Sequence, residues 1–339
     1  MIPTYLSAFA VALILCETVR AASYDYVIIG GGTCGLVIAN RLTELANITV
    51  AVIEAGGSVY NNVNVTNPSN YGAAFGTSID YANSTTNQVY ANGKSAVMRA
   101  GKALGGTSTI NGMAYTRASV EEHENFTLPA AFQLADGASY IPADHGHSGP
   151  VKVGWSDHIE NFTIFSIFNA SNNAVGLTYN QDPNGGHMHG FNFLPKLVDR
   201  DTGIRADAAR AYYFPYTKRK NLHLFLNTYA NKILWKSTKE TPVAGGVQVR
   251  AADGTVSTIY ASKEVIVSAG SLNYQALKTQ IVVNLPTVGE NLQDQPNNAF
   301  LLEGKRKPLW IFHIRRIPKH CRPLRLQLHE RRERYPIQT

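Results

Sequence analysis

Alternating apolar and polar positions predict a β-strand, a helix and a second β-strand near the start of the chain. Residues 24–29 (YDYVII) alternate and are rich in β-branched side chains, which is typical of a buried strand. Residues 36–45 have apolar side chains at helical spacing, and residues 48–56 (ITVAVIEAG) form a second apolar run. This order predicts a βαβ unit with a parallel sheet.

Three glycines lie in the turn between the first strand and the helix. Gly30, Gly32 and Gly35 fit the pattern G-x-G-x-x-G. In this pattern the first glycine allows a tight turn, the second lets the backbone approach a pyrophosphate, and the third lets the helix pack on the strand. The start of the helix offers free N–H groups to phosphate. Glu54 ends the second strand 19 residues after Gly35, where a carboxylate can accept hydrogen bonds from ribose hydroxyls. The sequence therefore predicts a dinucleotide site, which NAD and FAD both fit.

A second stretch rich in small residues, GKALGGTSTINGMAYTR at residues 101–117, bears on the choice of nucleotide. Small side chains let a chain lie flat against a ligand, and Thr107, Ser108 and Asn111 can supply hydrogen bonds. From the residues alone, the same stretch could also be a loop packed beneath a domain.

The motifs GGGTCG, VIEAG and GKALGGTSTINGMAYTR together resemble the glucose–methanol–choline (GMC) oxidoreductases, flavoenzymes that oxidise alcohols. Residues 201–235, 263–273 and 285–298 are also similar to that family, and Gln295 resembles its glucose-oxidase branch. The resemblance covers about residues 24–298. It implies an α/β fold, with a Rossmann-like FAD-binding domain and an α+β substrate-binding domain, and it favours FAD over NAD.

The resemblance also implies which residues contact FAD. Thr33 and Cys34 would lie at the pyrophosphate, and Glu54 with Ala55 at the ribose. Thr107 and residues 111–114 would lie along the ribityl chain and flavin ring, and the backbone of Ala230 would contact the adenine end. The expected FAD-binding residues are Gly30, Gly32, Thr33, Cys34, Gly35, Glu54, Ala55, Thr107, Asn111, Gly112, Met113, Ala114 and Ala230.

The chemistry that the resemblance implies is oxidation of a CH–OH group of a small-molecule alcohol. A histidine base takes the hydroxyl proton, hydride passes to flavin N5, and oxygen or another acceptor reoxidises the flavin. Sugars, aryl alcohols and secondary-metabolite alcohols are all open as substrates. No histidine here matches the motif that carries the base, so no catalytic residue is predicted. His187 and His189 lack further clustered ligands and indicate a surface loop rather than a metal site.

The charge of the chain is unevenly distributed. The net charge is +7, but residues 304–339 hold +9 and the remainder −2, so the body carries no nucleic-acid signature. Residues 299–339 lack helical or strand periodicity, and we interpret them as an aberrant basic tail from a frameshift, a retained intron or a degraded gene. A basic arm that binds polyanions is the alternative.

The family pattern also departs from this chain after residue 123 and after residue 273, and the family is nearly twice as long. We therefore expect a truncated chain, either an oxidoreductase by descent or a catalytically inactive remnant. The predicted layout is a leader (1–21), an FAD-binding domain (22–118 and 223–298), a substrate-side segment (119–222) and the tail (299–339).

Residues 6–16 form an apolar run too short to span a bilayer, followed by small residues that fit cleavage after Ala21. This predicts a signal peptide rather than a membrane anchor, and a secreted protein. Only three cysteines are present, so no disulfide framework is expected. Six N-x-[ST] sequons predict glycosylation at Asn47, Asn64, Asn83, Asn125, Asn161 and Asn169.

Overall fold

The computed structural model describes residues 22–272, apart from 90–91, 118–129, 134–139, 147, 156–168, 193 and 238–240. The predicted leader, two of the sequons (Asn125 and Asn161) and the basic tail lie outside the described residues. So does the final part of the predicted FAD-binding domain, residues 273–298.

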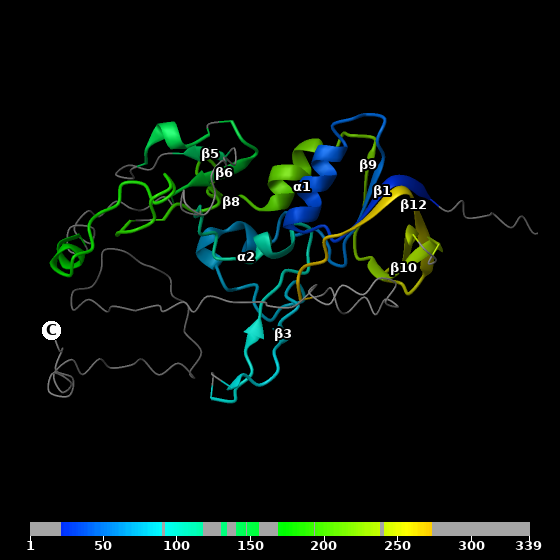
Figure 1. The fold of residues 1–339 in the computed structure, drawn as a ribbon, viewed down its shortest axis with the longest axis horizontal. Helices are drawn as coiled ribbons and strands as arrows, with labels where there is room; N and C mark the ends of the chain where they lie inside the picture. The colour runs from blue at the N-terminus through cyan, green and yellow to red at the C-terminus, as the bar shows by residue number, and fades with distance from the viewer. Residues whose placement is uncertain are drawn as a thin grey trace, which may run out of the picture. The chain divides into compact units, whose positions relative to one another are not determined.

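A six-stranded mixed sheet organises the described residues (Figure 1). Its order is β10-β11-β12-β1-β2-β9. Strands β12, β1, β2 and β9 run parallel, whereas β10, β11 and β12 form an antiparallel meander. The strands are β1 (Ser23–Ile29), β2 (Val50–Ile53), β9 (Leu222–Phe225), β10 (Tyr229–Ser237), β11 (Val243–Arg250) and β12 (Val256–Val267).

The two strands predicted from the sequence form the centre of the parallel region. In register, Val27 of β1 pairs with Ala51 of β2, and Val52 of β2 pairs with Leu224 of β9. All four residues of β2 are buried, because the sheet is covered on both faces, as is usual for parallel strands. The predicted α/β class and the βαβ unit are therefore confirmed.

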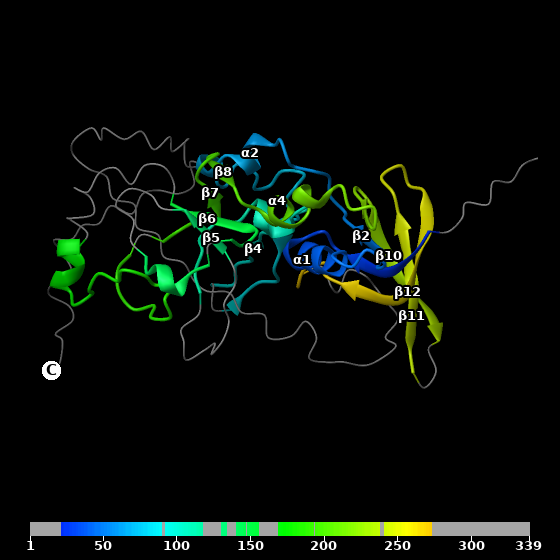
Figure 2. The ribbon, with the colours of Figure 1, turned by 90° about the horizontal axis from the view of Figure 1, so that it is seen from above.

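Helix α1 (Thr33–Leu42) lies against one face of the parallel strands, as Figure 2 shows. It ends three residues before the predicted Leu45, because a tertiary contact holds the following turn. The side-chain amide of Asn221 donates hydrogen bonds to the carbonyls of Thr43, Leu45 and Ile48, at 3.2, 3.0 and 2.7 Å. The apolar spacing along residues 36–45 could not predict this contact, because Asn221 is distant in sequence.

Shorter elements connect the sheet to the rest of the described chain. Residues 208–212 form α4, whose Ala208 and Ala209 pack in one cluster with Leu36 of α1 and Leu104. Part of the predicted substrate-side segment therefore packs on helix α1. The other elements are α2 (Val63–Thr66), β3 (Asn83–Ser84), β4 (Val97–Met98), β5 (Ala130–Gln133), β6 (Val151–Gly154), β7 (Val198–Asp199) and β8 (Ile204–Arg205), with 3₁₀ turns at Pro68–Asn70, Gly106–Thr109, Pro142–Asp144 and Phe214–Tyr216.

Within the described part of the chain, no helix is both long enough and apolar enough to cross a membrane.

Candidate functional site

The glycine loop, residues 30–35, runs from the end of β1 into the first turn of α1, and packing explains two of its glycines. Gly30 has a φ of +103°, and a Cβ there would lie 2.4 Å from the carbonyl oxygen of Ser268. A Cβ on Gly35 would lie 2.0 Å from the carbonyl oxygen of Gly30. Both contacts are with backbone atoms, so no side-chain rotation can relieve them. The first and third glycines are therefore required by the fold itself.

Gly32 is different, because the protein leaves space beside it. A Cβ at this position would find its nearest neighbour, the Cα of Gly106, at 3.7 Å, which is an ordinary contact. Its φ of −85° is also open to any residue. Nothing among the described residues therefore requires glycine here, whereas a ligand that approaches the backbone would. This fits the role predicted for the second glycine, next to a pyrophosphate.

The first turn of α1 faces the same space. Gly32 is the N-cap and provides no side-chain hydrogen bond, and the first turn contains no acidic residue. Thr33 and Cys34 are both exposed. The N–H groups and the positive end of the helix dipole are therefore available for an anionic group. Thr33 and Cys34, which are predicted to contact the pyrophosphate, both lie in this exposed first turn.

The second glycine-rich stretch, residues 101–117, lies directly on the glycine loop. The N–H of Gly105 donates to the carbonyl of Gly31 at 2.8 Å, and the N–H of Leu104 donates to the carbonyl of Gly57 at 3.0 Å. A Cβ on Gly106 would lie 2.7 Å from the Cα of Gly32. The two motifs that are distant in sequence therefore form one surface.

The members of the second stretch differ in exposure. Thr107, Gly112 and Ala114 are exposed, and Asn111 is half-buried. Met113 is 2 % exposed and has a φ of +63°. Its side chain points into the interior, so it can offer a ligand only its backbone. The stretch is thus partly a packed loop and partly an accessible edge, and the exposed residues are the ones that could meet a ligand.

Glu54 is held inside the fold at the edge of this surface. It is 6 % exposed, and its carboxylate oxygens accept N–H hydrogen bonds from Gly31 and Gly56, both at 2.8 Å. An ionised carboxylate has about four acceptor sites, so capacity remains for ribose hydroxyls. Burial raises the pKa of Glu54, and the two N–H hydrogen bonds and the charge of Lys102 oppose that rise. The predicted ribose acid therefore also fastens the loop that would hold the phosphate.

Three residues near Glu54 were not predicted from the sequence. The ammonium of Lys102 lies 5.9 Å from the ring centre of Tyr81 and 5.1 Å from that of Tyr229. Burial, together with the negative charge of Glu54, raises the pKa of Tyr81 to about 12, so its hydroxyl stays protonated. Only tertiary structure brings these residues together, and their spacing in the sequence carries no signal.

Ala55 and Ala230, both half-buried, are placed near this group by backbone hydrogen bonds. The N–H of Thr228 donates to the carbonyl of Glu54 at 2.9 Å, which brings the start of β10, with Ala230, to the end of β2. The expected ribose and adenine positions therefore lie at the same end of the sheet.

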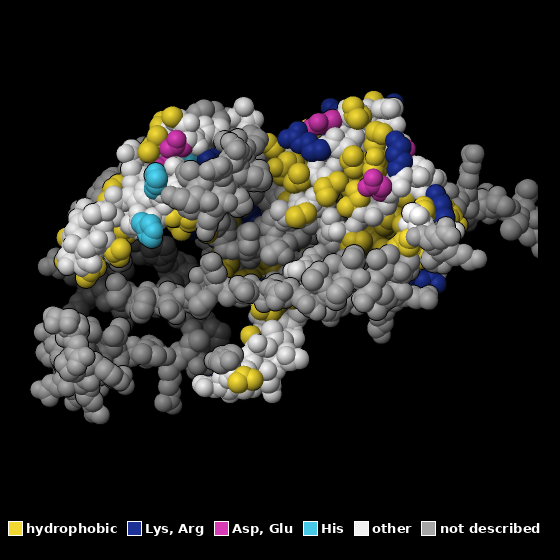
Figure 3. All heavy atoms as spheres, viewed as in Figure 1, with side chains coloured by type: hydrophobic (Ala, Val, Ile, Leu, Met, Phe, Trp, Pro, Cys, Tyr) yellow, Lys and Arg dark blue, Asp and Glu magenta, His cyan; other side chains and the backbone are white. Residues whose placement is uncertain are grey.

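The described histidines lie elsewhere. The Nε2 atom of His145 lies 2.5 Å from the carboxylate of Asp182, and both side chains are almost fully buried. His187 and His189 are exposed in a loop whose backbone carbonyls accept hydrogen bonds from the Asn180 amide. On the face drawn in Figure 3, the visible histidine side chains lie over the part that carries β5, β6 and β8.

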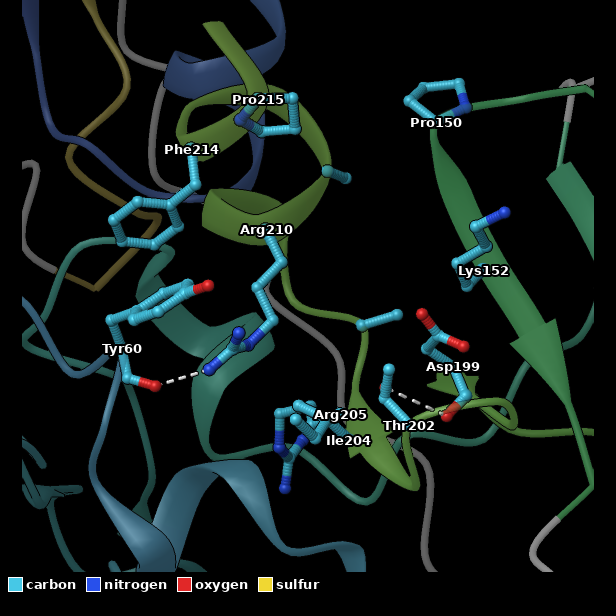
Figure 4. A pocket seen from close by; sticks show the side chains of 12 residues that line it. Tyr60, Pro150, Lys152, Asp199, Thr202, Ile204, Arg205, Arg210, Phe214 and Pro215 are labelled. Atoms are coloured by element: carbon cyan, nitrogen blue, oxygen red, sulfur yellow. Dashed lines mark hydrogen bonds between the residues drawn. The ribbon is translucent and has the colours of Figure 1, made fainter. Parts of the chain in front are cut away.

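A pocket of about 510 Å³ lies between α4, β6 and β8 (Figure 4). Its lining includes Tyr60, Lys152, Arg205, Arg210 and Phe214, and none of its lining residues belongs to the glycine loop or to residues 101–117. The candidate nucleotide site is therefore the surface formed by the two loops, and this pocket is separate from it.

The sequence model of the GMC oxidoreductases matches residues 24–297. The chain belongs to the GMC oxidoreductase family. Its relatives include the glucose oxidase-like protein fsoC of Humicola fuscoatra, which is 38 % identical over 89 % of this chain and 59 % of the relative. Glucose oxidase 2 of Penicillium expansum is 34 % identical over 82 % of this chain and 52 % of the relative. The chain thus spans about half the length of the curated relatives it matches.

Solved structures show the same fold. An FAD-dependent oxidoreductase from Chaetomium thermophilum is similar with a TM-score of 0.66 and 27 % identity, over 74 % of this chain and 46 % of that one. A fungal aryl-alcohol oxidase, at 21 % identity and a TM-score of 0.60, shows likeness of fold alone. The predicted family, fold class and FAD as the cofactor are confirmed at this level.

Substitution of the glycines separates folding from binding. Gly35→Ala puts a methyl group against a backbone oxygen and should lower the free energy of unfolding by about 3 kcal/mol or more. Gly32→Ala has room in the protein and should change that free energy by no more than about 1 kcal/mol. It should nevertheless weaken FAD binding by about tenfold or more, because the methyl group occupies the space for the ligand. Thermal unfolding and FAD titration measure the two effects; normal FAD affinity in folded Gly32→Ala would contradict this assignment.

The raised pKa of Glu54 predicts that FAD affinity depends on pH. Because burial raises the pKa above its ordinary value of 4.5, the ionised form is a cost to the cofactor-free fold above that pH. Ribose hydroxyls donate to the ionised form, so FAD affinity should fall as the pH drops through the raised pKa. Glu54→Gln should bind more weakly at pH 7, by roughly 1.5–3 kcal/mol, and lose this dependence. FAD titrations between pH 4 and 8 test both predictions. An equal dependence of FAD affinity on pH in wild type and in Glu54→Gln would contradict them.

Proposed function

We propose that the glycine loop, Glu54 and the exposed edge of residues 101–117 bind FAD, and that the protein oxidises a CH–OH group of a small-molecule alcohol. The observation that carries the proposal is the contact between the two loops, which leaves open space at Gly32 beside an uncapped helix start. When bound, FAD supplies the hydride acceptor for such an oxidation.

Each part of the surface has one role in this proposal. The N–H groups of Thr33 and Cys34, in the first turn of α1, bind the pyrophosphate. Glu54 accepts hydrogen bonds from the ribose hydroxyls while it holds Gly31 and Gly56. Thr107 and the exposed backbone at Gly112 and Ala114 line the ribityl chain and flavin ring. Ala230 contributes its backbone at the adenine end.

The substrate class comes from the relatives and stays broad. Among them are glucose oxidases, and the dehydrogenase xptC of Emericella nidulans is 29 % identical. These names support a small alcohol as the substrate and oxygen or another small acceptor as the oxidant. They do not favour a sugar over an aryl or secondary-metabolite alcohol.

A second possibility, FAD binding without turnover, is supported by the positions of the histidines. His145 is enclosed with Asp182, and its side chain is 0 % exposed, so it cannot meet a substrate. His187 and His189 belong to an exposed loop, and His223 lies on β9 with its ring 4.9 Å from that of Tyr24. None of these four histidines belongs to the glycine loop or to residues 101–117, which is the observation in favour of FAD binding without turnover.

Purified 339-residue protein should bind FAD in preference to NAD and show flavin absorption in the visible range. Uptake of NAD by a colourless folded protein would contradict the proposal. Anaerobic addition of primary and secondary alcohols then separates its two versions. Bleaching of the flavin would support oxidation by this chain, and an unchanged oxidised spectrum would support binding alone.

We also propose secretion, with cleavage after Ala21 and glycosylation at exposed sequons. Asn47 is exposed in the turn before β2, whereas the side-chain amide nitrogen of Asn83 is buried and cannot carry a glycan in this fold. In a eukaryotic secretory host, Asn47→Gln should lower the mass of the secreted protein by one glycan, and Asn83→Gln should leave the glycan mass unchanged. Intracellular protein that retains Met1 would contradict the proposal.

A further inference from the structure

Arg205 of β8 has an unusual position for a charged side chain. It is 1 % exposed and lies beneath the end of the second glycine-rich stretch. Figure 4 shows it at the edge of the pocket between α4 and β6. A buried guanidinium is costly unless its donors are satisfied, so its acceptors indicate what it does.

All of its hydrogen bonds go to neutral oxygens, on two separate segments. The Nε–H donates to the carbonyl of Val65, in α2, at 2.9 Å. The Nη1 group donates to the carbonyl of Asn111 at 2.8 Å, to the side-chain oxygen of Asn111 at 2.9 Å and to the carbonyl of Ser108 at 3.3 Å. The planar fork of an arginine is needed to reach acceptors in these two directions.

The same Asn111 oxygen controls the backbone that follows. It accepts a hydrogen bond from the N–H of Met113 at 3.1 Å, a local turn that short amide side chains stabilise. Met113 has a φ of +63°, which is unfavourable for a residue with a long side chain. A charged donor on Asn111 therefore helps to hold a strained backbone between Gly112 and Ala114, at the exposed edge.

A separate set of contacts holds the other end of the stretch. The hydroxyl of Ser108 accepts from the N–H of Ala208 at 2.9 Å and donates to the carbonyl of Gly105 at 2.6 Å. Gly105 in turn contacts the glycine loop through Gly31. The phosphate and ribose side of the surface therefore has support that does not pass through Arg205, whose own contacts with the stretch are its hydrogen bonds to Asn111 and the longer one to the carbonyl of Ser108.

We propose that Arg205 is a positioning residue for the flavin half of the cofactor site, which it orders through Asn111 without touching the cofactor. This inference rests on the proposed FAD site. It distinguishes the flavin half, which depends on Arg205, from the ADP half, which depends on the glycine loop and Glu54. A residue that only stabilised the fold would affect both halves alike.

The experiment compares the affinities of the purified protein for FAD and for ADP in wild type, Arg205→Lys and Arg205→Met. In the variants, FAD affinity should fall by about tenfold or more, as expected for loss of a charged hydrogen bond that orders a binding loop. ADP affinity should change by less than about threefold. The visible band of bound flavin should also lose fine structure, because the ring is held less rigidly.

Arg210→Met is the matched control. Arg210 is also an arginine that donates to a carbonyl, that of Tyr60, and its Nε lies 3.3 Å from the carboxylate of Asp207. Unlike Arg205, it is not hydrogen-bonded to Ser108 or Asn111 in the described part of the chain. The Arg210→Met variant should leave the ratio of FAD to ADP affinity at the wild-type value. Thermal unfolding of every variant measures how much each substitution changes the stability of the fold.

The possible results separate the inference from the proposed function. Wild-type protein that binds ADP and FAD equally weakly, or prefers NAD, would refute the FAD site itself. FAD binding by wild type with an equal fall for both ligands in Arg205→Lys and Arg205→Met would overturn the positioning role. Failure of both variants to fold would also overturn it, since Arg205 would then serve the whole fold.

Discussion

Backbone-to-backbone contact between two glycine-rich loops is the constraint on which the cofactor surface depends. Gly56 and Gly106 show how close the approach is, because a Cβ on Gly56 would lie 2.2 Å from the carbonyl oxygen of Lys102 and a Cβ on Gly106 would lie 2.7 Å from the Cα of Gly32. Side chains at these points would push the loops apart by more than an ångström. The surface is therefore built from main chain, and its N–H and carbonyl groups are positioned by the sheet beneath rather than by rotamers. Such a surface loses little conformational freedom when a ligand binds.

Glu54 shows how one side chain can serve the fold and the site together. Its carboxylate joins the glycine loop to the residues that follow β2, so the positions proposed for the ribose and the phosphate are linked by one group. The arrangement has a cost, since burial disfavours the ionised form. A ligand that donates to the remaining lone pairs removes part of that cost.

Local patterns predicted the elements that depend on local physics. The βαβ unit, the glycine turn and Glu54 follow from periodicity and from the φ that a tight turn needs, and family resemblance extended them to the second loop. The end of α1 and the roles of Tyr81, Lys102 and Arg205 were not predictable in this way. Each depends on partners that are distant in sequence, such as Asn221 for the helix end, and a lone basic residue is more often on the surface. Single-sequence patterns contain no record of those partners.

The closure of the glycine turn by β12 has a consequence for biosynthesis. The turn at Gly30 lies against the carbonyl of Ser268, and the N–H of Ser268 donates to the carbonyl of Ile29 at 2.7 Å. At a synthesis rate of about 5–20 residues per second, the ribosome adds the partner of this turn roughly 10–50 s after the turn itself. Throughout that interval β1 lacks β12, one of its two neighbouring strands, and the glycine turn lacks its contact with Ser268. The nascent chain therefore completes the glycine turn only late in synthesis, and β1 keeps one edge unpaired until β12 has been made.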